Sequence, residues 1–156
     1  MSTIRVLALM LVSGQGLAGQ AATTVDRDHL PLRIMPDTLA VCRLKADGPL
    51  PPWALVSQPF LTITRTRTEL SVTAPQSLVA GEPHCERDYR AVRVVGPLPL
   101  DLIGIVAALA EPLARKGVSL FAISTYETDY VLVKAADLPH ALEAWRRAGH
   151  TIAAAP

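Results

Sequence analysis

The second half of the chain reads YRAVRVVGPLPLDLIGIVAALAEPLARKGVSLFAISTYETDYVLVKAADLPHALEAWRRAGHTI, from residue 89 to residue 152. Its first seven residues, Tyr89 to Val95, are rich in valine and favour a β-strand. Gly96 and Pro97 follow at once and predict that the strand ends there. The segment therefore opens with one well-bounded strand.

A helix is expected next, from Asp101 to Lys116, because apolar residues recur there at helical spacing. These residues are Leu102, Ile105, Val106, Leu109 and Leu113. Asp101 is placed to cap the start of this helix, and Gly117 to end it in a left-handed conformation. Pro112 lies in mid-helix, where it predicts a kink or a local break.

The remainder of this half predicts two strands, a helix and a short final strand. Apolar strands over 118–124 and 130–134 flank a tight loop, Asp137 caps the start of a helix that stops at Gly149, and residues 150–152 form the last strand. The order strand, helix, strand, strand, helix, strand is that of the ferredoxin-like βαββαβ sandwich. We therefore expect an α+β fold with both helices on one face of an antiparallel sheet.

The first half repeats part of this order in a shorter form. It predicts a strand over 39–44, a helical turn over 53–56, and a hairpin of 60–64 with 70–73. We interpret the chain as two related units in tandem, the first of them degenerate. The expected boundaries are 29–80 for the first unit, 81–88 for a linker and 89–153 for the second unit.

The N-terminal residues 1–28 differ from the rest and are expected to be a leader or a disordered extension. Arg5, an apolar run and the small residues Gly19 and Ala21 fit a short secretory signal peptide, with cleavage after residue 21. A frayed N-terminal extension of a cytosolic protein, which only resembles a leader, fits equally well. If the chain is exported, Cys42 and Cys85 become candidates for a disulfide, whereas in the cytosol both should stay reduced.

Composition excludes several classes of protein. Half of the 156 residues are hydrophobic and the net charge is +1, which argues against disorder and against a phosphate-tracking nucleic-acid binder. No apolar run reaches the roughly 18–20 residues of a membrane span. The four histidines are scattered, so we expect no metal site and no cofactor. Nucleophile elbows and phosphate-binding loops are also missing from the sequence, which disfavours an enzyme.

Two segments are candidates for ligand binding. The loop from Gly96 to Gly104 leads into a helix N-terminus, whose free N–H groups attract a carboxylate, although Gly104 could equally serve tight packing. The segment from Ser124 to Tyr130 is rich in hydroxyl groups and contains Asp129, which could bind an ammonium group. Its polar side chains could equally satisfy the backbone of an ordinary turn. The two loops need not lie at the same end of the sheet.

Three stretches resemble the small bacterial ACT-domain proteins of the CASTOR type, relatives of the eukaryotic cytosolic arginine sensors. They are residues 89–98, 103–105 and 121–134, and the segment Ser124-Thr-Tyr-Glu-Thr-Asp-Tyr130 is the most specific. Residues 40–44, 52–54 and 68–72 match the first half of the same proteins. The resemblance covers about residues 32–152 and leaves the N-terminal leader outside.

The resemblance implies two tandem ACT units that bind a free amino acid at their interface. Asp129 would hold the α-amino group of the ligand. The other implied contacts are Thr125, Tyr126, Gly104 and, from the first unit, Ser71 and Val72. Independently of the resemblance, we expect the ligand carboxylate to meet backbone N–H groups around Ile103 and Ile105 at the helix start. The side chain of the ligand is left open, because the further arginine-contacting groups of the sensors have no assured counterparts.

The leading hypothesis is thus a non-catalytic amino-acid sensor without a cofactor, metal or nucleic-acid partner. The alternative is a structural or oligomerisation module that forms a homodimer through its open sheet edges, without a ligand. The resemblance implies a cytoplasmic location, with export as the alternative if residues 1–21 are cleaved.

Overall fold

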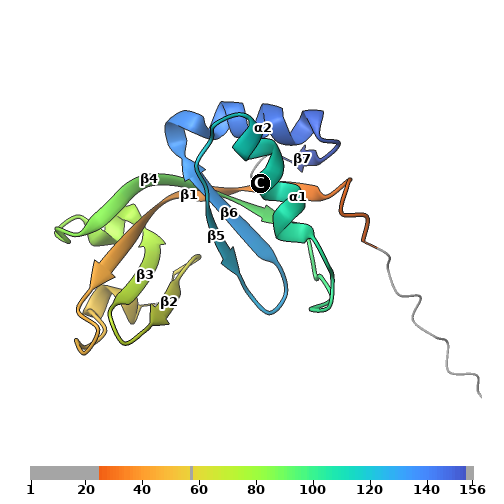
Figure 1. Cartoon of the computed structure of the whole chain (residues 1–156). Coiled ribbons are helices and arrows are strands. Elements are labelled where there is room, and N and C mark those ends of the chain that lie inside the picture. The colour runs from red at the N-terminus through yellow and green to blue at the C-terminus, as the bar shows by residue number, and fades with distance from the viewer. Residues whose placement is uncertain (1–24, 57, 154–156) are drawn as a thin grey trace, which may run out of the picture.

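The computed structural model describes residues 25–56 and 58–153, and it folds them around one seven-stranded sheet (Figure 1). The strand order is β2-β3-β1-β4-β6-β5, and β7 pairs with β1. The strands are β1 (Pro31–Leu44), β2 (Thr62–Arg65), β3 (Leu70–Pro75), β4 (Cys85–Val94), β5 (Phe121–Ser124), β6 (Asp129–Lys134) and β7 (Thr151–Ala153). The helices are α1 (Ile105–Arg115) and α2 (Leu138–Arg147), and there are 3-10 turns at Pro52–Ala54, Gln76–Val79 and Ala135–Asp137. The expected α+β, ferredoxin-like architecture is confirmed.

The main core lies between the two helices and one face of the sheet. Alternate residues of each strand point to this face, so that Val92 and Val94 of β4 meet Val131 and Val133 of β6 beneath the helices. Trp145 of α2 is fully buried at this interface, and its Nε1–H donates a hydrogen bond to the Leu109 carbonyl of α1 at 2.9 Å. This hydrogen bond joins the two helices through the core.

Helix α1 starts later than the sequence suggests. Its N-cap is Gly104, which has a φ of 88° and no side-chain cap, so the expected capping role of Asp101 is wrong. A left-handed backbone at Gly104 turns the chain sharply into the helix, and glycine adopts that conformation without a steric penalty. Asp101 lies in the exposed loop before this turn.

The break expected at Pro112 is also wrong, because α1 continues through Pro112 to Arg115. Proline has no N–H to pair with the carbonyl four residues earlier, which here belongs to Ala108. That carbonyl instead lies 3.3 Å from Nε2 of the buried His150, while Nδ1 of His150 accepts a hydrogen bond from the Leu30 N–H at 3.1 Å. His150 therefore fills the position that Pro112 leaves open.

Strand β1 passes through both halves of the sheet. Its first residues lie between β7 and β4, with Leu32 opposite both Ile152 and Val94. Its last residues lie between β3 and β4, with Cys42 opposite both Val72 and Cys85. The tandem arrangement of two units stays a prediction, because one sheet runs through the described chain.

The linker expected over 81–88 is only partly a loop, since β4 already begins at Cys85. Cys85 and Cys42 form a disulfide between these two strands, 43 residues apart in sequence. Strand pairing extends to this point because the Arg43 N–H donates to the His84 carbonyl at 2.9 Å. The covalent bond thus ties the first half of the chain to the start of the second.

The face of the sheet away from the helices carries a smaller apolar cluster. Phe60, from the segment before β2, packs on Leu39, Ala91 and Leu132 of three adjacent strands. The Phe60 ring also meets Tyr130 edge-on, at 5.1 Å between ring centroids. One connecting segment thereby covers part of this face.

The leader expected over residues 1–28 lies outside the described residues up to position 24. In the part of the chain that the structure describes, neither helix is long and apolar enough to cross a membrane.

Candidate functional site

The two loops singled out in the sequence lie at the same end of the sheet. The end of β4 pairs with the start of β6, with Arg93 opposite Tyr130. Beyond these strands the Leu98 N–H donates to the Glu127 carbonyl at 2.8 Å. A Cβ at Gly96 would lie only 2.8 Å from the same carbonyl oxygen. Glycine at this position therefore allows the two loops to touch.

The turn between β5 and β6 is closed by threonines. The backbone N–H and Oγ1 of Thr125 both donate to the Thr128 carbonyl, at 2.9 and 2.8 Å. The buried Thr128 hydroxyl donates to the Val94 carbonyl of β4 at 2.6 Å. These bonds satisfy the backbone, as expected for hydroxyl side chains in turns, and they also fix the position of the turn beside the helix α1.

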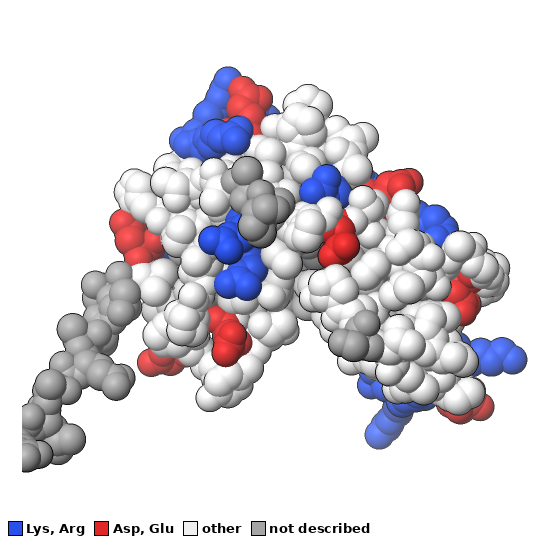
Figure 2. Space-filling view, turned by 180° about the vertical axis from the view of Figure 1, so that it is seen from behind, with Lys and Arg blue, Asp and Glu red and all other residues white. Residues whose placement is uncertain are grey.

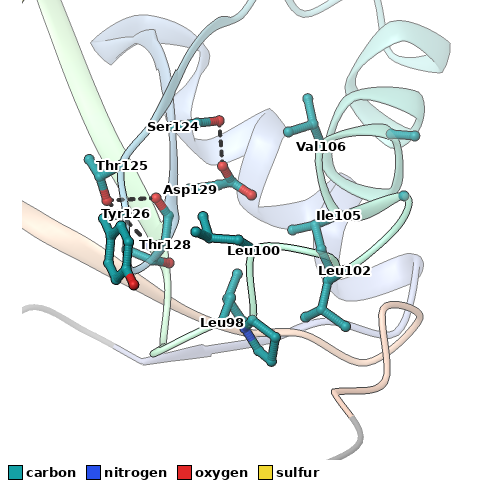
Figure 3. A pocket seen from close by; sticks show the side chains of 13 residues that line it. Leu98, Leu100, Leu102, Ile105, Val106, Ser124, Thr125, Tyr126, Thr128 and Asp129 are labelled. Carbon is teal, nitrogen blue, oxygen red and sulfur yellow. Dashed lines mark hydrogen bonds between the residues drawn. The ribbon is translucent and has the colours of Figure 1, made fainter.

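A pocket of about 400 Å³ lies between the 98–102 loop, the first turn of α1 and the β5–β6 turn (Figure 3). Its lining comes from three segments that are separated in sequence. The lining residues are Leu98, Pro99, Leu100, Leu102, Gly104, Ile105, Val106, Ala107, Ser124, Thr125, Tyr126, Thr128 and Asp129.

Asp129 is the one charged residue among those that line the pocket. It is half-buried, and its Oδ1 accepts a hydrogen bond from the Ser124 hydroxyl at 2.5 Å across the β5–β6 pair. Figure 3 shows the carboxylate of Asp129 directed toward the first turn of α1. Ser124 leaves the second carboxylate oxygen available for a ligand.

The first turn of α1 offers the opposite polarity. The first N–H groups of a helix have no partner within the helix, and the helix dipole makes this end positive. No side chain caps α1, because its N-cap is Gly104. A carboxylate of the protein and an uncapped helix N-terminus therefore line the same pocket.

Of the residues predicted for the site, the structure brings Asp129, Thr125, Tyr126, Gly104 and Ile105 together around this pocket. The other three lie elsewhere. Ile103 is 84% exposed and does not line the pocket.

Ser71 and Val72 of β3 do not reach this pocket either. Val72 is fully buried in the core of the first half. Ser71 lines a separate pocket of about 400 Å³ between the hairpin β2–β3 and the edge strand β5, which shares Ser124 and Thr125 with the first pocket. Figure 2 shows a notch between the two corresponding lobes of the surface.

The residues that sequence reasoning missed are mostly apolar. Leu102 and Val106 fit core positions of the helix, and Leu98 and Leu100 carry no pattern that separates a pocket wall from a loop. Ser124 belongs to the hydroxyl-rich segment, where nothing in the sequence marks it as the partner of Asp129. Within residues 25–56 and 58–153, no group of three or more histidine, cysteine or acidic side chains could hold a metal ion.

Family models match both halves of the chain. Residues 84–147 match the family model of the ACT domain, and residues 37–82 match a family described as an N-terminal domain. The matched C-terminal segment contains every residue that lines the pocket. This part of the chain is therefore similar to ACT domains.

Solved structures resemble the chain over most of its length. A protein from Agrobacterium tumefaciens is 28% identical, with a TM-score of 0.76, and the match covers 82% of this chain and 95% of that one. A protein of unknown function from Vibrio cholerae, described as a possible transport protein, is 20% identical, with a TM-score of 0.64 and coverage of 76% and 90%. The ligand-free regulatory subunit of aspartate kinase from Thermus thermophilus is 14% identical, with a TM-score of 0.52 and coverage of 75% and 96%. The last two show a shared fold.

Proposed function

We propose that this protein is a non-enzymatic sensor that binds a free amino acid in the pocket between α1 and the β5–β6 turn. The observation that carries the proposal is the pairing of Asp129 with an uncapped helix N-terminus across one pocket. The α-ammonium group of an amino acid would bind Asp129, and its carboxylate would bind the N–H groups at the start of α1. Thr125 and Tyr126 would form the wall on the turn side.

The lining favours an aliphatic ligand. Leu98, Leu100, Leu102, Ile105 and Val106 line the pocket that would receive the ligand side chain, and Asp129 is the only carboxylate among the lining residues. Valine, leucine and isoleucine therefore suit it better than arginine, even though the chain resembles the arginine-sensing CASTOR family.

Calorimetric titration with the free amino acids tests this proposal. A charge-assisted hydrogen bond contributes about 1.5–3 kcal/mol, so Asp129→Asn should weaken binding about tenfold or more. Glu127→Gln is the matched control, because Glu127 is an exposed acid two residues away that does not line the pocket. Equal affinity of the wild type and Asp129→Asn would refute the site.

A tandem arrangement would extend the site toward the first half of the chain. In that case Ser71 of the neighbouring pocket would approach the ligand from the far side of Thr125, as the CASTOR-type resemblance implies. Ser71→Ala should then weaken binding about threefold to tenfold. An unchanged affinity would restrict the site to the ACT domain.

The alternative function is an oligomerisation module without a ligand. Strands β2 and β5 form the two ends of the sheet order, and an unpaired strand edge can pair with another copy. A thermal-shift screen with all twenty amino acids separates the alternatives, since ligand at one hundred times its dissociation constant stabilises the folded state by about 2.7 kcal/mol. If no amino acid raises Tm and the protein is a dimer in solution, the oligomerisation module is favoured.

Location is a further point for experiment. The resemblance to cytosolic sensors supports the cytoplasm, whereas the disulfide Cys42–Cys85 supports export to an oxidising compartment. Mass spectrometry of the purified native protein decides between them, because a mature N-terminus at Ala22 would mean that the leader is cleaved.

A further inference from the structure

Two arginines lie side by side on the face of the sheet away from the helices. Arg33 of β1 is directly opposite Arg93 of β4 in the antiparallel register. Their sequence neighbours Leu32, Val92 and Val94 point into the helix-covered core, so both arginines point to the other face.

Neither arginine is neutralised within the described residues. Other basic side chains pair with acids, as Arg115 does with Glu111 and Arg147 with Glu143, whereas no salt bridge is formed by Arg33 or Arg93 with any described residue. Arg93 is half-buried, and its Nε is shielded from solvent without a hydrogen-bond acceptor.

Like charges directly opposite each other on neighbouring strands are destabilising. Unfilled donors on a half-buried guanidinium add to this cost. An anion bound between the two guanidinium groups would remove the repulsion between them. The pair is also separate from the amino-acid pocket, whose lining includes neither arginine.

We propose that Arg33 and Arg93 bind the phosphate group of a small phosphorylated ligand. A phosphate monoester carries a charge of about −1.5 to −2 at neutral pH, which matches the two positive charges of the pair. Two planar guanidinium groups can each donate two parallel hydrogen bonds to phosphate oxygens. Tyr130, opposite Arg93 in the register, provides a ring beside this position.

The test is thermal unfolding and calorimetric titration of the full chain with inorganic phosphate and with glycerol phosphate, against sodium chloride of equal ionic strength. We expect both phosphates to raise Tm and chloride to leave it unchanged. Binding of glycerol phosphate at least as tight as that of inorganic phosphate supports a phosphorylated metabolite, whereas binding of the inorganic ion alone would overturn that part of the proposal.

Arg33→Gln and Arg93→Gln should each weaken phosphate binding about tenfold or more. Arg43→Gln is the matched control, because Arg43 is an exposed arginine of the same strand that faces Ser71 rather than another arginine. This control should keep the phosphate response of the wild type.

The sign of the effect on stability distinguishes a binding pair from a structural one. Without phosphate, Arg33→Gln removes a repulsion and should raise Tm by about 1–3 °C, and with phosphate the wild type should become the more stable protein. A wild type that shows no phosphate response, or an Arg33→Gln variant that keeps the full response, would refute the site. Arg33 is exposed, so this variant remains informative even if Arg93→Gln fails to fold.

Discussion

The two halves of the molecule cover and stabilise the same sheet in different ways. Over residues 84–153, two amphipathic helices cover one face and bury Trp145 completely. Over residues 31–83, short 3-10 turns and small clusters take the place of helices, and the second tryptophan, Trp53, is only half-buried. The first half is instead tied to β4 by the disulfide Cys42–Cys85. Covalent linkage thus supports the part of the sheet where apolar burial is smaller.

Replacing each tryptophan by alanine tests this difference in burial between the two halves most directly. Trp145→Ala should destabilise the protein by about 3–5 kcal/mol, because it empties the centre of the core and removes the hydrogen bond to Leu109. Trp53→Ala should cost only about 1–2 kcal/mol, since this side chain is half-buried and bonds Glu82 near the surface at 2.9 Å. Urea unfolding followed by far-UV circular dichroism measures both values.

Each variant keeps one tryptophan as a fluorescent probe of the other half. Because β1 joins the halves, the fluorescence and dichroism midpoints should coincide. Equal costs for the two substitutions would contradict the contrast between the halves.

Removing the disulfide should produce the second largest effect. The cross-link spans 43 residues, and bridges that close loops of this length contribute about 2–4 kcal/mol. We expect the Cys42→Ala/Cys85→Ala double variant to lose this amount, and the wild type in excess dithiothreitol to behave in the same way. A variant as stable as the oxidised wild type would show that apolar packing alone holds the first half.

The pairing of Pro112 with His150 provides a finer test within the helical half. His150→Ala should destabilise by about 1–3 kcal/mol, because the buried Leu30 N–H loses its acceptor and the Ala108 carbonyl loses its donor. Pro112→Ala supplies a backbone N–H to that carbonyl, so it should reduce the cost of His150→Ala by about 0.5 kcal/mol or more. Strict additivity in the double-mutant cycle would refute the compensation.

The smallest expected effect on stability concerns the segment that precedes β1. Hydrogen bonds from His29 and from the Asp28 N–H hold the pKa of Asp26 below its ordinary value of 3.8. A lowered folded-state pKa adds stability above pH 3.8 that is lost as the pH falls through the folded-state value. Asp26→Asn should therefore narrow the stability difference between pH 6 and pH 3 slightly, as measured by urea unfolding. If the difference in stability between pH 6 and pH 3 is the same in Asp26→Asn and the wild type, Asp26 does not contribute to the pH dependence.

Most of the second half could be predicted from its apolar periodicity. Both helices and the strands β4 to β7 lie near the positions that valine-rich runs and helical spacing predict, and Gly117 has the expected positive φ, 68°. The errors arose where tertiary contacts override local rules. Gly104 rather than Asp101 starts α1, and His150 allows Pro112 inside it, which depends on a residue far away in sequence.

The candidate site was predictable on its polar side only. Asp129 and Thr125 belong to a hydroxyl-rich segment that stands out between two apolar strands. Leu98 and Leu100 do not stand out, because an apolar loop residue has the same pattern whether it lines a pocket or a core. The expected participation of Val72 rests on the resemblance alone, and its side chain is fully buried in the core of the first half.

The position of β1 between β7 and β4 has a consequence for biosynthesis. Leu30 and His150, which meet at this junction, are separated by 120 residues. A ribosome therefore releases β1 long before β7, and the sheet around β1 cannot be completed until β7 has been synthesised. Such late, non-local pairing slows folding and leaves strand edges exposed on the nascent chain. A fragment made of residues 84–147 alone would likewise lack both β1 and β7, which complete its sheet.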